Sequence, residues 1–192
     1  YYNNIRLSGK TLLKNFEAVR DFAAHETNTI TLDRSNVNVN DLVQDIIDEF
    51  RIPAEFKEIS LIKNVQPDLP RVYIDRWRIH RALTNILKNS ITYNPIGGWI
   101  RIHANLDACG MIRISIEDNG DGMRPDDIKL KKEPFGRALR NPDVTRNGLG
   151  LGLPLASRLI ELHGGQLDIV SDVNRGTCVN MTLPVAKLNA VA

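Results

Sequence analysis

Several classes of protein are excluded by what this sequence has little of. It has only two cysteines, Cys109 and Cys178, without a Cys-x-x-Cys pair, which excludes a zinc site built from cysteines and disfavours a disulfide-stapled secreted domain. No apolar run approaches the roughly 18 residues that a membrane span needs. The formal charge is only +2, too balanced for a nucleic-acid coat or a polybasic membrane anchor. We therefore expect reduced thiols, a cytoplasmic location and no nucleic-acid partner, with any membrane attachment supplied by the full-length protein.

What is present is the composition of an ordinary globular domain. The chain has 192 residues, of which 42% are hydrophobic and 25% charged, so it can bury a sizeable core. This length allows one domain, or one domain with an appendage. The N-terminal Tyr-Tyr-Asn-Asn has neither an initiator Met nor a signal peptide, so we expect the chain to be a piece of a longer protein.

Hydrophobic periodicity predicts helices in the first third of the chain. Apolar residues recur every three or four positions within residues 1–24, which indicates a long amphipathic helix with one apolar stripe. A β-rich stretch follows at 29–38. Asn40 or Asp41 is then placed to cap a second helix, which carries the apolar positions of residues 42–50.

The remainder of the chain reads as one more pair of helices and a set of strands. Asp75 begins an amphipathic helix that extends through Tyr93 and is stopped by Pro95 and by Gly97-Gly98. Residues 119–148 are polar, without clear periodicity, and a structureless connection of this length is usually a lid or a binding loop. The other expected elements are strands at 59–65 and 72–74, a hairpin of 99–106 with 111–117, a helix at 149–162, and a hairpin of 166–171 with 177–183.

This order of elements predicts the fold class. The last two strand pairs have connections too short for parallel crossovers, so a doubly wound parallel sheet is excluded. We expect an α/β (α+β) two-layer sandwich, in which helices cover one mixed sheet.

One cluster of candidate binding residues follows directly after an expected strand. It is the segment Asp118-Asn119-Gly120-Asp121-Gly122. A carboxylate at a strand end can accept a hydrogen bond from an exocyclic amine, and Gly120 and Gly122 let the backbone approach a flat ring. Alone, such a segment is most often a turn.

Two further clusters have the chemistry of a phosphate and metal site. Gly148, Gly150 and Gly152 lead straight into a helix, whose free N–H groups and dipole favour an anion. Asn85 and Asn89 lie four positions apart, on one helical face, and amide oxygens suit a hard cation such as Mg²⁺. Taken together, the three clusters predict a site for adenine, phosphates and magnesium.

The ordered set of motifs resembles the ATP-binding domain of sensor histidine kinases, in the wider group shared with gyrase, Hsp90 and MutL. The resemblance spans essentially the whole chain, and the F box and Gly152-Leu153-Pro154-Leu155 are similar to cell-cycle kinases of the PleC/DivJ type. It implies a Bergerat-type ATP-binding fold. The matching segments are an N box at Asp75–Arg78 and Leu83–Pro95, a G1 box at Asp118–Gly122, an F box at Glu133–Gly136, a G2 box at Gly148–Gly152, and Leu162–Gly165 and Arg175–Thr177.

The resemblance also implies roles for individual residues. Asp118 would bind the adenine amino group, Asn89 would coordinate Mg²⁺, and Thr177 would support the adenine end. Tyr93 resembles the aromatic residue beside the base, and residues 123–147 would be the ATP lid. The full set of ATP-binding residues that it implies is Asn85, Asn89, Tyr93, Asp118, Gly120, Gly122, Gly148, Gly150, Gly152 and Thr177.

The same resemblance divides the chain into two parts. Residues 1–27 resemble the second helix of a dimerisation and phosphotransfer hairpin, and 28–192 form the catalytic domain. The first helix, with the phospho-accepting histidine, is missing, although His25-Glu26-Thr27-Asn28-Thr29 mimics a histidine box. The implied reaction moves the ATP γ-phosphoryl group to that histidine, for relay to an aspartate of a response regulator or to a phosphotransfer protein. The full-length protein would form a homodimer through its N-terminal helix.

Two other functions remain open at this point. A degenerate kinase-like module would dock partners and use nucleotide weakly or not at all; in favour of it, Thr92 stands where the family has a lysine near the phosphates. A hydrolase of the gyrase or MutL kind needs a glutamate base one turn before the Mg²⁺-binding Asn. Asn85 or Arg81 occupies that place here, which disfavours hydrolysis.

Overall fold

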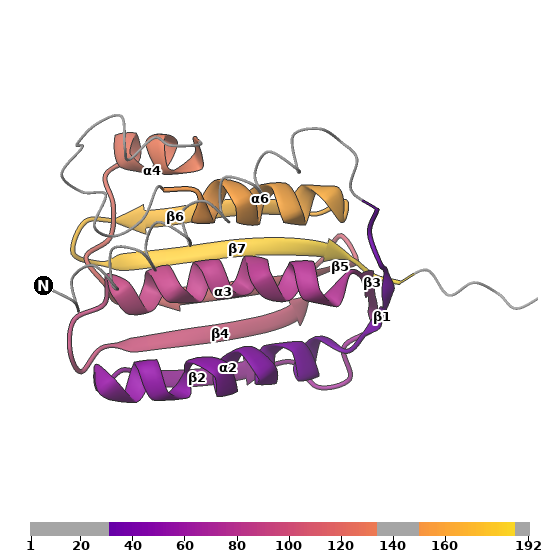
Figure 1. Ribbon diagram of the computed structural model, residues 1–192, viewed down its shortest axis with the longest axis horizontal. Coiled ribbons are helices and arrows are strands. Elements are labelled where there is room, and N and C mark those ends of the chain that lie inside the picture. Colours follow the sequence, from indigo (N-terminus) through magenta and orange to yellow (C-terminus); the bar gives the residue numbers. More distant parts are fainter. Residues whose placement is uncertain (1–30, 134–149, 187–192) are drawn as a thin grey trace, which may run out of the picture.

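The computed structural model describes residues 31–133 and 150–186. The elements are β1 (Ser35–Val37), α2 (Val39–Phe56), β2 (Ser60–Val65), β3 (Val72–Ile74), α3 (Arg76–Thr92), β4 (Trp99–Leu106), β5 (Met111–Asp118), α4 (Pro125–Lys132), α6 (Gly152–Leu162), β6 (Gln166–Asp172) and β7 (Gly176–Pro184). In Figure 1 the helices α2, α3 and α6 lie side by side against one face of the sheet. The predicted two-layer α/β sandwich is confirmed, whereas the predicted N-terminal helix lies outside the described residues.

The main sheet has five strands in the order β2-β4-β5-β7-β6. The pair β2 and β4 is parallel, and the other neighbours are antiparallel, as the two predicted hairpins require. Strands β1 and β3 form a separate two-stranded sheet. The register of β5 against β7 places Asp118 opposite Thr177, so two predicted binding residues far apart in sequence become neighbours.

The core lies between the sheet and its helices. Side chains alternate along β4 and β5 so that every second residue is buried, which is the pattern of a sheet with one covered face. The helices α2, α3 and α6 each present an apolar stripe to the sheet. The largest fully buried side chains are Leu42, Ile46, Ile74, Ile79, Leu83, Ile86, Leu87, Ile100, Ile102, Ile112, Ile114 and Ile116.

The start of α2 differs from the prediction. The N-cap is Asn38, not Asn40 or Asp41, and its side chain accepts the backbone N–H of Asn40 at 2.8 Å. The helix begins two or three residues earlier than expected because Val39 is buried in the core, so its first turn is fixed by packing as well as by capping.

Helix α3 begins and ends as predicted, with Asp75 as N-cap and Tyr93 as C-cap. The Oδ1 atom of Asp75 accepts the backbone N–H of Arg78 at 3.1 Å. At the other end, Lys57 Nζ donates to the carbonyls of Ile91, Thr92 and Asn94 at 2.9 to 3.1 Å. A cation at the helix C-terminus stabilises the end of α3 that faces the site described below.

The polar connection at 119–148 is not structureless in its described part, because α4 occupies Pro125–Lys132. Proline at the first helical position and two aspartates in the first turn favour this helix, but it has almost no apolar periodicity, which is why that pattern did not predict it. Helix α6 starts at Gly152 rather than at 149, because Gly150 has a φ of 74°, in the left-handed region. None of the helices in the described parts of the chain is long and apolar enough to cross a membrane.

Candidate nucleotide site

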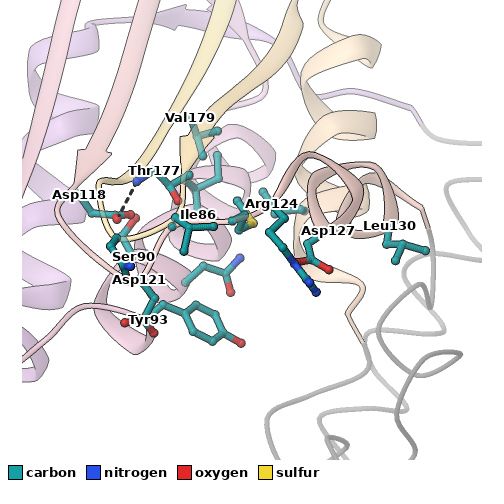
Figure 2. A pocket seen from close by; sticks show the side chains of 16 residues that line it. Ile86, Ser90, Tyr93, Asp118, Asp121, Arg124, Asp127, Leu130, Thr177 and Val179 are labelled. Atoms are coloured by element: carbon teal, nitrogen blue, oxygen red, sulfur yellow. Dashed lines mark hydrogen bonds and ion pairs between the residues drawn. The ribbon is translucent and has the colours of Figure 1, made fainter.

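A cavity of about 540 Å³ lies where the C-terminal half of α3, the G1 box, α4 and the turn between β6 and β7 meet. This volume is within the range of small-molecule sites. Figure 2 shows Asp118 and Thr177 at one end and Arg124 and Asp127 at the other. The lining residues are Ile86, Asn89, Ser90, Tyr93, Asp118, Asp121, Gly122, Met123, Arg124, Asp127, Leu130, Leu153, Val173, Asn174, Thr177 and Val179.

Asp118 is the buried carboxylate of this cavity, with 6% of its surface exposed. Its Oδ1 atom accepts the backbone N–H groups of Gly120 at 3.0 Å and Thr177 at 3.1 Å. These bonds stabilise the carboxylate and fix its direction, and a carboxylate offers about four acceptor positions in all. The hydroxyl of Thr177 forms a hydrogen bond with that of Ser171 at 2.9 Å, which holds the Thr177 side chain in place as well.

The two glycines of the G1 box fit tightly between backbone segments. A Cβ atom at Gly120 would lie 2.6 Å from the Tyr93 carbonyl oxygen, and one at Gly122 only 1.8 Å from the Asp172 carbonyl oxygen. Gly122 also has a φ of 65°. Such approaches leave no room for a side chain, so both positions require glycine for the G1 box to pack against these backbone segments.

Helix α3 supplies the opposite wall. Asn89 and Tyr93 line the cavity, and the Tyr93 carbonyl accepts the backbone N–H of Asp121 at 3.1 Å, which ties the helix end to the G1 box. Asn85 is not among the lining residues. It lies one turn earlier, close enough to Gly152 that a Cβ there would meet it at 3.8 Å. Thr92 is exposed and its hydroxyl donates to Lys88 of its own helix at 2.7 Å.

The N-terminus of α6 is the candidate phosphate site. Gly150 and Gly152 precede and begin this helix, while Gly148 lies outside the described residues. Among the described residues, none makes a hydrogen bond with the buried Nδ2 atom of Asn85. Because a buried donor without a partner is costly, this amide beside Gly152 fits an anionic group that binds there.

The side chains present also fit a Mg²⁺ ion that is bound to the phosphates of a nucleotide. Within the described residues no three His, Cys, Asp or Glu side chains gather to hold a metal ion. Mg²⁺ is commonly held by one or two protein oxygens together with substrate phosphates and waters. The amide of Asn89, on the cavity wall, is of that kind.

The cavity mouth carries charges that pattern reading did not assign. Arg124 Nε donates to Asp127 Oδ2 at 3.0 Å. This bond, with the negative charge of Asp127, raises the pKa of the Arg124 guanidinium, so it is always a cation. Asp127 and Leu130 lie on α4, and a proline followed by two aspartates was the available signal for that helix.

Other lining residues had no local signal at all. Val173 and Asn174 belong to the β6–β7 turn, which reaches the site because the Asn174 N–H donates to the Asp121 carbonyl at 2.8 Å. Ile86 lies in the N box, Leu153 in the segment Gly152–Leu155 and Val179 in an expected strand, but none of the three was expected to line the site. Their place in the cavity follows from packing between distant segments.

Comparison with protein families decides the identity of this fold. A family model described as histidine kinase-, DNA gyrase B-, and HSP90-like ATPase matches residues 74–187. The chain belongs to this ATPase family. The resemblance found from the sequence motifs is thereby confirmed, and the chain carries the ATP-binding domain of these ATPases.

Individual members of this ATPase family are similar over most of the chain. The adaptive-response sensory kinase SasA of Rippkaea orientalis is 34% identical over 146 residues, which are 76% of this chain and 37% of that protein. The non-motile and phage-resistance protein of Caulobacter vibrioides is 30% identical over 188 residues, 96% of this chain and 22% of that protein. The structure of full-length ShkA in complex with AMPPNP superimposes with a TM-score of 0.84 at 27% identity, over 97% of this chain and 38% of that one. The chain thus spans well under half the length of these relatives.

Proposed function

We propose that this chain is the catalytic ATP-binding part of a sensor histidine protein kinase, a transferase of a two-component signalling system. The observation that carries the proposal is the buried carboxylate of Asp118, fixed by two backbone N–H groups in a cavity of about 540 Å³. The family assignment and the sensory kinases among its relatives support it. ShkA, which superimposes on the chain, binds AMPPNP.

In the proposed complex the adenine amino group donates to the Asp118 carboxylate. Gly120 and Gly122 bring the backbone up to the ring, Tyr93 flanks the base, and Thr177 holds the acidic side chain in position. The G2 glycines 148, 150 and 152 and the start of α6 face the phosphates, with Asn85 beside them. Asn89 provides an amide oxygen to Mg²⁺, which neutralises charge on the phosphates when it is bound.

The proposed reaction is a phosphoryl transfer between ATP and an imidazole. A bond forms between a histidine ring nitrogen and the γ-phosphorus, and the bond from that phosphorus to the β,γ-bridging oxygen breaks. ADP leaves with the oxygen, and the ring loses its proton. The domain contributes by positioning and by charge stabilisation. Hydrolysis is disfavoured because the amide of Asn85, one turn before Asn89, cannot remove a proton from water.

The partners follow from this reaction. The acceptor histidine belongs to a segment that precedes the chain, and residues 1–27 form the second helix of the dimerisation hairpin. The phosphoryl group passes on to a response-regulator aspartate or a phosphotransfer protein. Since ATP is the donor, the domain works in the cytoplasm, whether or not the full-length protein is attached to a membrane.

The first test is the replacement of Asn89 by alanine. We expect the factor by which Mg²⁺ strengthens ATP binding to fall by roughly 10-fold or more. The reason is that removal of even an outer-shell partner of a metal ligand lowers metal affinity or activity by at least about 10-fold. Titration of a fluorescent ATP analogue with and without Mg²⁺ measures it. Thr92→Ala is the matched control, since the Thr92 hydroxyl bonds its own helix. Equal Mg²⁺ dependence in wild type and Asn89→Ala would remove Asn89 from the site.

The second test separates a kinase from a docking module. The full-length protein is incubated with ATP labelled in the γ-phosphate, with this chain alone as the control. The proposal expects saturable nucleotide binding by both and an acid-labile label on the full-length protein only. A chain that shows no saturable binding below the millimolar range would instead be a docking module.

A further inference from the structure

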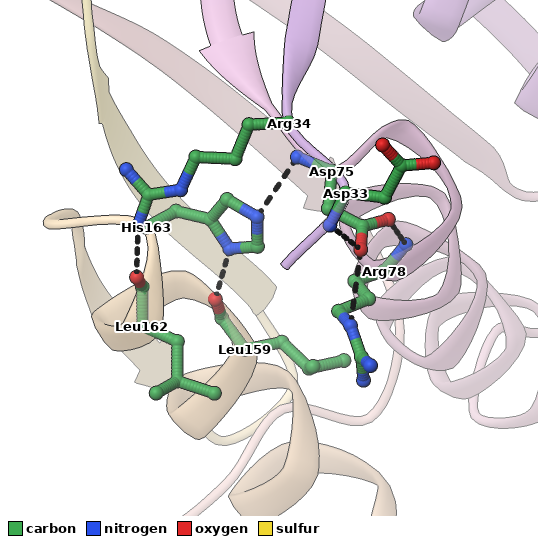
Figure 3. A network of polar contacts seen from close by, with 7 residues as sticks. All are labelled: Asp33, Arg34, Asp75, Arg78, Leu159, Leu162 and His163. Carbon is green, nitrogen blue, oxygen red and sulfur yellow. Dashed lines mark hydrogen bonds and ion pairs between the residues drawn. The ribbon is translucent and has the colours of Figure 1, made fainter. Parts of the chain in front are cut away.

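The ends of α3 and α6 that lie away from the cavity are joined through a buried histidine (Figure 3). His163, the C-cap of α6, is 1% exposed. Its Nε2 atom accepts the backbone N–H of Asp75, the N-cap of α3, at 3.0 Å. A backbone amide can only donate, so the ring is neutral with its proton on Nδ1, which donates to the Leu159 carbonyl at 2.6 Å.

Asp33 and Arg34, in the chain segment that precedes β1 (the entering segment), form hydrogen bonds with the same ends of α3 and α6. The Asp33 N–H donates to Asp75 Oδ2 at 3.2 Å, and Arg78 Nε donates to the same oxygen at 3.1 Å. Arg34 Nη2 donates to the carbonyl of Leu162, the last residue of α6, at 2.9 Å. We call these contacts of Asp33, Arg34, Asp75 and His163 the joint. It connects the entering segment to both helices.

Both helices run from the joint to the nucleotide cavity. Tyr93, the C-cap of α3, and Leu153, in the first turn of α6, both line the cavity. The two helices also approach each other at that end, where Asn85 lies beside Gly152. With 11 residues, α6 is about 16 Å long. A tilt of α6 at the joint therefore displaces its first turn, at the opposite end. Packed helices move as rigid elements, which carries the displacement to the cavity.

We propose that Asp75 and His163 are positioning residues that set α6 against α3, and that Arg34 couples the entering segment to the nucleotide cavity through the joint. The proposal rests on the proposed function for its effect on ATP. Its direct consequence, a change at the first turn of α6, is independent of any nucleotide. A displacement of the entering segment at Asp33 and Arg34 thereby alters the geometry of the ATP site.

The hydrogen bond to Asp75 makes the joint sensitive to acid. Burial lowers the pKa of His163, the Leu159 carbonyl and Asp75 act in the opposite direction, and Arg34 and Arg78 face the ring as further cations that lower it. The unfolded chain therefore takes up a proton first as the pH falls below about 6.5, and stability is lost from there down to the folded-state pKa. We expect the urea midpoint of the wild type to drop between about pH 7.5 and 5.5 by more than that of His163→Gln, whose amide keeps an acceptor and does not titrate. Equal drops would contradict the neutral ring.

The coupling is tested by a pair of arginine variants. Arg34→Ala removes the bond to the end of α6. Arg71→Ala removes an equally exposed bond, from Arg71 Nη1 to the Asn36 carbonyl at 3.3 Å, which touches neither helix. We expect Arg34→Ala to weaken binding of a fluorescent ATP analogue by about fivefold, in the range of coupling between sites, and Arg71→Ala to leave it unchanged. His163→Phe, which keeps a ring without an acceptor, is expected to weaken it further, and His163→Gln to restore it.

Hydrogen exchange of the nucleotide-free protein separates this proposal from the proposed function. The Leu155 N–H bonds the Leu151 carbonyl at 3.0 Å in the first turn of α6. Its exchange is expected to be faster in Arg34→Ala and His163→Phe than in the wild type, and unchanged in Arg71→Ala and His163→Gln. This result supports the joint even where ATP binding is absent. Identical exchange in Arg34→Ala and Arg71→Ala would overturn it, whatever the nucleotide affinity.

Discussion

Asparagine in place of Asp118 is expected to weaken ATP binding by roughly 100-fold while the domain stays folded. The Oδ1 atom of Asp118 accepts two backbone N–H groups, from Gly120 and Thr177, and the amide oxygen of asparagine can accept the same two. The other half of the side chain then becomes an NH₂ donor. It meets the amino group of adenine, also a donor, so a charge-assisted hydrogen bond is replaced by two unsatisfied donors.

Inosine triphosphate provides the complementary measurement for Asp118. Its base has a carbonyl oxygen where adenine has the amino group. The carboxylate of Asp118 repels this oxygen, whereas the NH₂ group of an asparagine can donate a hydrogen bond to it. We therefore expect the ratio of ATP to inosine triphosphate affinity to invert in Asp118→Asn, with a urea midpoint close to that of the wild type. An unchanged ratio would mean that the purine amino group does not face this side chain, and the proposed kinase function would lose its main support.

Much of the fold was predictable because its signals are local. The hairpins of β4 with β5 and β6 with β7 follow from strict alternation and short turns, and the structure has them nearly residue for residue. Asp75 was recognised as the start of α3 because a capping residue precedes a helical apolar stripe. The true cap of α2, Asn38, was missed in favour of Asn40 or Asp41, since three capping residues lie close together and only the burial of Val39 selects among them.

The residues of the candidate site also differ in whether a local motif marks them. Asp118, Gly122 and Asn89 stand in short motifs, and all three line the cavity. The turn residues Val173 and Asn174 line it only because β7 pairs with β5, a contact between segments far apart in sequence. The division of the chain at 27/28 and the dimerisation helix fall outside the described residues and remain predictions. The binding roles assigned to the site residues, Gly148 among them, remain predictions as well.

His163 shows how position gives a residue more than its sequence context suggests. In the sequence it is only the histidine of the Leu162–Gly165 motif, whereas in the structure it is the C-cap of α6 and only 1% exposed. Its bond to Asp75 spans 88 positions along the chain, which no local pattern reveals. Short motifs can therefore be recognised in the sequence, whereas the joint cannot, because its contacts link residues far apart in the chain.

Alanine in place of Gly122 is expected to lower the free energy of unfolding by about 3 to 5 kcal/mol and to abolish nucleotide binding. Two costs add. The φ of 65° is left-handed, which costs an alanine about 1 kcal/mol. In addition, the new Cβ would lie 1.8 Å from the Asp172 carbonyl oxygen, and a backbone atom cannot move aside as a flexible side chain can. The β6–β7 turn must shift, and with it Val173 and Asn174 of the cavity wall.

Gly110 offers the matched control for this argument. Its φ is 75°, so Gly110→Ala bears the same conformational cost, yet nothing lies within 4 Å of the added Cβ. We expect it to lose only about 1 kcal/mol of stability and to bind nucleotide as the wild type does. Urea unfolding of both variants measures the difference, which isolates the steric contact between the G1 box and the β6–β7 turn. Equal destabilisation of the two would show that this contact yields easily, and that the turn is not what holds Gly122 against the nucleotide cavity.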